Sequence, residues 1–151
     1  MPKMKWSELK NQQLGRYGEY YAMMEFASYG CDIYSSQVDD SGIDFVTKIN
    51  DVFYEVQVKS VCKSIYTYIL KSKMQITNEF RLVCYLRFSN DNLPEVYIIP
   101  ATAWQIPNAV FLDRDYETGK SKPEWGINDS QKHRYLLTPY LSSMFFNKSE
   151  K

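Results

Sequence analysis

Polarity alternates along residues 53–59, "FYEVQVK", as it does in a β-strand that presents two different faces. Successive side chains of a strand point to opposite faces, so residues two apart share a face. The apolar face consists of Tyr54, Val56 and Val58. The other face carries Phe53 and the polar residues Glu55, Gln57 and Lys59. The apolar face belongs against a core, and the polar face is either exposed to solvent or part of a functional site.

The pattern elsewhere predicts one long helix followed by several strands. Apolar residues recur at helical spacing from Leu14 to Met24, and Gly30 is a typical helix stop, so a helix should begin between Ser7 and Gln13 and end at Gly30. Strands are predicted at residues 31–36, 43–49, 52–61, 80–89 and 95–101, with 65–73 as a further candidate. Turns are predicted at 37–42, 50–51 and 90–94, a loop or short helix at 74–80, and short helical segments at 101–106 and 136–145.

These elements predict an α/β (α+β) protein with a mixed β-sheet flanked by helices. The chain has 151 residues, enough to bury one core, and it contains no repeats or linkers. A single domain spanning residues 1–151 is therefore expected. No segment resembles a signal peptide or could span a bilayer, so we expect a soluble cytoplasmic protein.

Charge and cysteine content narrow the possible functions. The chain has 18 basic and 18 acidic residues, which argues against a wholly cationic nucleic-acid binder. The charges are clustered, however, so a basic face could lie next to an acidic pocket; solvated surface charge explains any single cluster equally well. Three cysteines without CxxC spacing and one histidine argue against a structural zinc site or a disulfide framework.

Asp44 is the first candidate site residue. It opens a strand between the apolar residues Ile43 and Phe45, where a buried carboxylate is costly unless it is paired or binds a cation. The hairpin at 50–51 should bring Asp44 next to the polar face of the following strand. Carboxylates, an amide oxygen and an amine suit Mg²⁺, which activates water for phosphodiester hydrolysis, while a lysine stabilises the developing anion.

The segments "GIDF" and "EVQVKS" resemble the core of the PD-(D/E)XK nuclease superfamily, which includes restriction endonucleases and Holliday junction resolvases. Asp44 matches the first Asp of the pattern and Lys59 matches its Lys. Glu19, in "GRYGEYYAMMEF", matches the helical Glu of the resolvase-like branch. The resemblance covers roughly residues 14 to 61. Gln57 stands where the pattern has an acid, so either Gln57 is a ligand with charge supplied by Glu19 or Glu55, or Glu55 itself is the ligand.

The resemblance implies a restriction-endonuclease-like core and a Mg²⁺- or Mn²⁺-dependent endonuclease that hydrolyses nucleic acid, expected to be DNA. The implied catalytic and metal-binding residues are Asp44, Gln57, Glu19 and Glu55, with Lys59 assisting the water. Lys63, Lys71 and Lys73 could contact phosphates, and Tyr66 and Tyr68 could stack on bases, although surface charge and core packing explain them equally well. The small chain could act as a homodimer.

Two alternatives to a nuclease remain. One is a catalytically inactive nuclease-fold module that binds nucleic acid or a protein partner, with Gln57 marking the lost chemistry. The other is an immunity or anti-restriction protein that acts through its acidic patches, for which the sequence contains no motif.

Overall fold

The computed structural model describes residues 1–35, 42–117, 119 and 121–149. Its α-helices are α1 (Asn11–Ser28) and α2 (Ser142–Ser149). Its 3-10 helices are η1 (Trp6–Glu8), η2 (Lys71–Lys73), η3 (Ala101–Gln105) and η4 (Arg134–Tyr140). Its strands are β1 (Asp32–Ser35), β2 (Phe45–Ile49), β3 (Val52–Cys62), β4 (Tyr66–Leu70), β5 (Arg81–Phe88), β6 (Glu95–Pro100), β7 (Phe111–Arg114) and β8 (Glu124–Asn128). None of the helices among these residues is long and apolar enough to cross a membrane.

The strands form two sheets. The larger has the order β1-β2-β3-β5-β6, and the smaller has the order β4-β8-β7. Strands β3 and β5 are parallel, and every other neighbouring pair is antiparallel. Parallel neighbours need a long crossover connection, which is usually helical. Here the crossover between β3 and β5 contains β4 and η2 instead, so part of the smaller sheet is built from the connection within the larger one.

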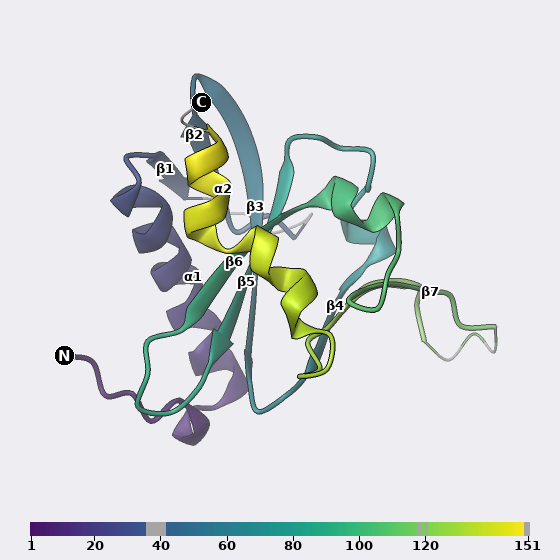
Figure 1. The fold of residues 1–151 in the computed structure, drawn as a ribbon, viewed down its shortest axis with the longest axis horizontal. Helices are drawn as coiled ribbons and strands as arrows, with labels where there is room; N and C mark the ends of the chain where they lie inside the picture. Colours follow the sequence, from purple (N-terminus) through teal and green to yellow (C-terminus); the bar gives the residue numbers. More distant parts are fainter. Residues whose placement is uncertain (36–41, 118, 120, 150–151) are drawn as a thin grey trace.

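A separate hydrophobic core covers each face of the larger sheet. Val56 of β3 packs in the core that contains Phe26 of α1, and Val61 of β3 packs in the core that contains Ile69 of β4. Figure 1 shows α1 on one side of β3 and the strands β4 and β7 on the other. The alternating pattern of β3 arises because odd-numbered and even-numbered side chains face different layers. The predicted mixed α/β sheet with flanking helices is confirmed.

A close approach between α1 and β3 depends on Gly18. A Cβ atom at this position would lie 1.9 Å from the Ser60 hydroxyl oxygen, so any larger residue would push the helix away from the strand. The predicted helix is confirmed over α1, and the hairpin between β2 and β3 is confirmed as well. Its turn residues Asn50 and Asp51 have φ of 51° and 65°, the geometry of the tight hairpin turn.

Residues 74–80, predicted as a loop or short helix, form a loop, so the first alternative is confirmed. The segment after Pro107 differs from the expected elements. The hydrophobic pattern predicts no strand after Pro107, yet β7 and β8 lie there. In β8 the buried positions include the charged Glu124 and the small Gly126, which interrupt any apolar alternation. The turn predicted at 37–42 lies outside the described residues except for Gly42.

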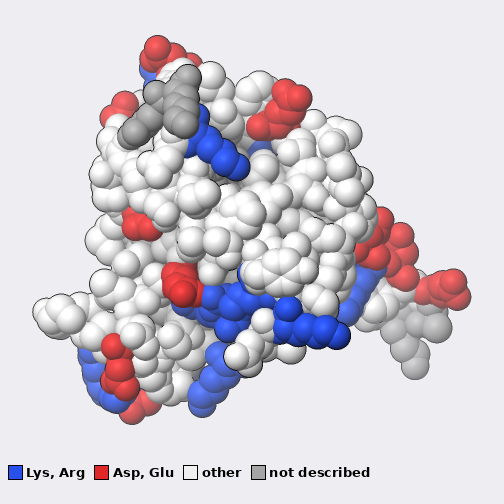
Figure 2. Space-filling model, viewed as in Figure 1, with Lys and Arg blue, Asp and Glu red and all other residues white. Residues whose placement is uncertain are grey.

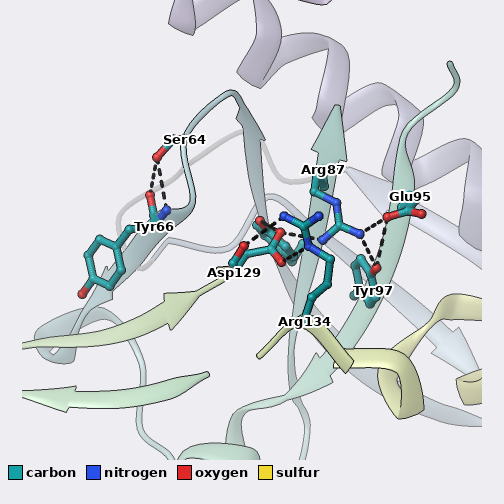
Figure 3. Close-up of polar contacts among 8 residues, drawn as sticks. Ser64, Tyr66, Arg87, Glu95, Tyr97, Asp129 and Arg134 are labelled. Carbon is teal, nitrogen blue, oxygen red and sulfur yellow. Dashed lines mark hydrogen bonds and ion pairs between the residues drawn. The ribbon is translucent and has the colours of Figure 1, made fainter. Parts of the chain in front are cut away.

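A buried ionic network ties η4 to the larger sheet (Figure 3). Asp129, 1% exposed, accepts hydrogen bonds from the Tyr85 hydroxyl at 2.7 Å and from Arg87 Nη1 at 2.6 Å. Arg134 Nε donates to the second Asp129 oxygen at 2.9 Å. Arg87 also forms an ion pair with Glu95 of β6. Two guanidinium groups thus compensate the buried carboxylate of Asp129, as a buried charge requires.

The Tyr85 hydroxyl in this network predicts a loss of stability at alkaline pH. Burial, followed by the hydrogen bond to Asp129, raises the pKa of Tyr85 above its ordinary value of about 10. Above about pH 10 the unfolded chain therefore releases a proton that the folded protein keeps, so the free energy of unfolding falls as pH rises. Urea unfolding between about pH 9 and about pH 11 should show this fall, and Tyr85→Phe should reduce its slope. Equal slopes in the two proteins would contradict this explanation.

Candidate active site

The polar face of β3 forms part of a cavity beneath β4. The cavity has a volume of about 420 Å³. It is lined by Gly42, Gln57, Lys59, Thr67, Tyr68, Leu70 and Lys73. Gln57 and Lys59 come from β3, and most of the remaining residues come from β4 and η2. Two of the three polar side chains in the alternation of β3, Gln57 and Lys59, therefore face a cavity.

Gln57 has an unsatisfied polar atom in this cavity. The residue is 7% exposed, and its Oε1 atom is buried without a hydrogen-bond partner among the described residues. Leaving a buried acceptor unpaired costs about 1–3 kcal/mol. Gly42 has a φ of 74°, and a Cβ at this position would lie 2.9 Å from Gln57 Nε2. Glycine therefore both permits the backbone conformation and leaves room for the Gln57 amide.

The carboxylate of Asp44 lies against the backbone of β3 between Gln57 and Lys59. Asp44 Oδ2 accepts a hydrogen bond from the Val58 N–H at 2.7 Å, and the Asp44 N–H donates to the Val56 carbonyl at 2.8 Å. An ionised carboxylate has about four acceptor positions, and the Val58 N–H occupies one of them. The start of β2 therefore places a negative charge beside the two polar residues of β3.

Glu19 and Glu55 do not line the cavity. Glu55 Oε1 lies 3.7 Å from the Nε atom of Arg81, its neighbour on β5. Glu19 is near Arg16 on α1, with Oε2 and Nη1 3.4 Å apart, and lines a separate open cavity of about 850 Å³. Among the residues that the structure describes, no group of three or more His, Cys, Asp or Glu could hold a metal ion. Gln57 at the expected acid position contributes to this result.

The three lysines predicted to contact phosphates lie in different surroundings. Lys73 lines the cavity together with Lys59. Lys71 forms ion pairs with Asp113 and Asp115, and its Nζ lies 4.2 Å from the centre of the Trp125 ring. Lys63 lines a different cavity of about 670 Å³, next to the buried ionic network. The structure therefore places only Lys73 of these three at the cavity of Gln57.

The surface charge is not uniform on the face drawn in Figure 2. Basic side chains form a band across its lower part, and acidic side chains gather at the right-hand edge, beside the position of β7 in Figure 1. The acidic residues of this segment are Asp113, Asp115 and Glu117. Although the net charge of the chain is zero, basic and acidic side chains form separate clusters on this face.

Gln57 lines the cavity, and Asp44, which is not a lining residue, binds the adjoining β3 backbone at Val58; their oxygen atoms are compatible with Mg²⁺. The Asp44 carboxylate and the Gln57 amide oxygen are hard oxygen ligands, and the unpaired Gln57 Oε1 would gain a partner from a cation. Mg²⁺ usually keeps several waters and binds through one or two carboxylates together with substrate phosphates. Asp44 is the one negative ligand in this set, so a Mg²⁺ ion bound here would need substrate phosphates as further ligands.

The fold is similar to that of two nucleases. A Holliday junction resolvase from Archaeoglobus fulgidus, Hjc, superimposes with a TM-score of 0.52 at 12% identity, covering 76% of this chain and 84% of the resolvase chain. The bacterial homing endonuclease I-Ssp6803I superimposes with a TM-score of 0.53 at 16% identity, covering 93% and 94% of the two chains. No protein-family model matches the sequence, and no curated protein matches it.

These similarities define the class of fold. The chain has the restriction-endonuclease-like fold, which the resemblance to the PD-(D/E)XK superfamily predicted, and that prediction is confirmed. Both of these structural neighbours are nucleases.

Proposed function

We propose that the protein is a metal-dependent endonuclease that hydrolyses phosphodiester bonds of DNA. The observation that carries this proposal is the buried Gln57 Oε1 without a partner, next to Lys59 and the Asp44 carboxylate, in a nuclease-like fold. A neutral oxygen buried beside a carboxylate is poorly stabilised by the protein alone. A cation at this point would compensate both groups.

Each residue has a distinct role in the proposed reaction. Asp44 and Gln57 would hold Mg²⁺ or Mn²⁺, which when bound would supply Lewis-acid chemistry by lowering the pKa of a bound water and offsetting phosphate charge. The Lys59 ammonium donates hydrogen bonds to the attacking water or to a phosphoryl oxygen and stabilises the negative charge that develops there. Lys73 contacts a neighbouring phosphate. Glu19 and Glu55 remain predicted as additional ligands. Neither lines the cavity, so the side chain of each would have to move away from its arginine neighbour to bind the ion.

Further parts of the proposal rest on sequence and size. Lys63 and Lys71 are proposed to contact more distant phosphates, although Asp113 and Asp115 already offset the charge of Lys71. The protein is proposed to act in the cytoplasm. The protein is further proposed to act as a homodimer.

Calorimetric titration with Mn²⁺ tests the metal site. We expect wild-type protein to bind Mn²⁺ and Asp44→Asn to lose that binding, because the variant keeps the shape of the side chain but removes the negative ligand. Gln57→Glu should bind Mn²⁺ roughly tenfold more tightly, because ligand charge sets cation affinity. Glu19→Gln and Glu55→Gln, measured in parallel, identify any contribution from these two acids. Unchanged Mn²⁺ affinity in both Asp44→Asn and Gln57→Glu would overturn the assignment of the ligands.

A second candidate function is a catalytically inactive module that binds nucleic acid or a protein partner. It is favoured by Gln57 at the acid position and by the lack of three clustered metal-binding residues in the described part of the chain. On this interpretation Asp44 has a structural role, which includes accepting the hydrogen bond from the Val58 N–H. The two functions differ in one measurement, because the inactive module binds its partner without binding Mn²⁺.

A further inference from the structure

Tyr68 lies between two cavities. One is the cavity of Gln57 and Lys59, and the other has a volume of about 430 Å³ and is lined by Tyr66, Tyr68, Leu70, Tyr116, Ser121, Lys122 and Glu124. Tyr68 and Leu70 of β4 line both. Tyr68 is 46% exposed, which is high for a tyrosine in a strand that otherwise contributes to a buried core. The exposed ring therefore adjoins the proposed catalytic cavity directly.

The neighbouring Tyr66 is held in place by the protein itself. Its hydroxyl donates a hydrogen bond to the carboxylate of Glu124, and the guanidinium carbon of Arg114 lies 4.5 Å from the centre of its ring. Burial and the bond to Glu124 raise the pKa of Tyr66, so its hydroxyl stays protonated as a donor. Tyr66 stacks on Tyr68 with ring centres 6.3 Å apart and an interplanar angle of 26°. Arg114, Tyr66 and Tyr68 thus form a connected series, and Tyr68 is its open end.

We infer that Tyr68 stacks on an unpaired base of the substrate while the adjoining phosphate lies in the cavity of Gln57 and Lys59. This inference rests on the proposed nuclease function and specifies its substrate class. Binding of single-stranded nucleic acid combines a positive groove for the backbone with aromatic side chains for the bases. Lys59 and Lys73 supply the positive groups here, and Tyr68 supplies the aromatic surface.

The substrate class follows from the geometry of stacking. In a paired duplex each base is stacked between its neighbours, so an enzyme must take a base out of the stack before a side chain can cover its face. Single strands, unpaired ends and bulges present such a base without that cost. The structure therefore favours DNA with unpaired nucleotides at the cleavage site over fully paired duplex.

Oligonucleotide binding without metal tests the role of Tyr68 separately from catalysis. A fluorescent single-stranded oligodeoxynucleotide and the same sequence as a blunt duplex are titrated with wild type, Tyr68→Ala and Tyr68→Phe in the presence of EDTA. Tyr68→Ala should weaken single-strand binding roughly 5- to 150-fold, the range expected for one lost base–aromatic stack, and change duplex binding less than about twofold. Tyr68→Phe should retain single-strand affinity because its ring can still stack.

The matched control is Tyr135→Ala. Tyr135 is 68% exposed on η4 and lines neither cavity, so its replacement should leave single-strand affinity unchanged. A 2-aminopurine base in the unpaired region should lose fluorescence on binding to wild type and to Tyr68→Phe, but not on binding to Tyr68→Ala. Circular dichroism of each variant verifies that the fold is retained.

The results separate failure of this inference from failure of the proposed function. Equal weakening of single-strand and duplex binding by Tyr68→Ala, or no weakening, overturns the stacking role even if the wild type cleaves DNA. The same loss in Tyr135→Ala overturns it too, because the effect is then not specific to the cavity. Tyr68-dependent single-strand binding without metal-dependent cleavage supports the stacking role and overturns the nuclease proposal. No binding of either oligonucleotide by wild type in EDTA overturns the stacking role, and the cleavage assay with Mg²⁺ then decides the nuclease proposal separately.

Discussion

Replacing Lys59 with alanine is expected to reduce Mg²⁺-dependent cleavage of DNA by roughly 10²- to 10³-fold, the usual effect of removing one donor that stabilises a developing negative charge. Lys59 lines the cavity that holds Gln57, so its ammonium is in position to contact a phosphoryl oxygen. Asp44→Ala should abolish cleavage in the same assay, because it removes the carboxylate that binds the β3 backbone at Val58, between Gln57 and Lys59. Both effects are measured as initial rates on a labelled oligonucleotide with an unpaired segment.

The control for Lys59→Ala is a second lysine on the same hairpin. Lys48 of β2 lies 3.7 Å from Asp51 at the turn and does not line the cavity, so Lys48→Ala should cleave at the wild-type rate. Thermal unfolding of all three variants shows whether the fold survives. Undiminished cleavage by Lys59→Ala and Asp44→Ala would rule out this catalytic assignment.

Replacing Asp129 with asparagine is expected to lower the free energy of unfolding by about 3–5 kcal/mol, because breaking a buried ion pair leaves the remaining charges uncompensated. Asparagine has nearly the same shape but no charge to offer Arg87 and Arg134. Arg87 keeps its ion pair with Glu95, whereas both hydrogen-bond acceptors of Arg134 among the described residues belong to Asp129. The effect is measured by urea unfolding as a shift in midpoint.

The matched substitution for Asp129→Asn is Asp51→Asn. Asp51 has a 98% exposed side chain, and asparagine tolerates its positive φ, so this variant should unfold at the wild-type urea concentration. A midpoint for Asp129→Asn equal to that of Asp51→Asn would show that the buried network contributes little to stability.

The part of the fold that the sequence predicted is local. The helix α1 and the hairpin of β2 and β3 follow from spacing and turn residues within short windows, and the hairpin alone brings Asp44 to the backbone of β3. The resemblance at "GIDF" and "EVQVKS" lies in the same local unit. Helical periodicity, strand alternation and turn chemistry are all properties of neighbouring residues, so a single sequence is sufficient to reveal them.

The rest of the site depends on contacts between distant segments. Residue patterns do not reveal that β4 pairs with β8, where Tyr66 lies opposite Asn128 and Leu70 lies opposite Glu124. Without that pairing, nothing indicates that Gln57 is buried or that Gly42 must leave room for its amide. Glu19 matches the sequence pattern of a helical ligand, but the pattern contains no information on the direction of its side chain. In the structure Glu19 lies beside Arg16 on α1.

The crossover through β4 has a consequence for how the protein folds. The β2–β3 hairpin closes a short loop. By contrast, β4 and β8 are separated in sequence by β5, β6 and β7, so β4 can pair with β8 only when the chain as far as Asn128 is present. Contacts between distant residues form slowly because closing a long loop costs more entropy. The side of the cavity formed by β3 is thus expected to form early, and the side formed by β4 and η2 is expected to form late. We therefore expect Gln57 to stay in water for most of the folding reaction, and the proposed catalytic cavity to be completed in the last steps.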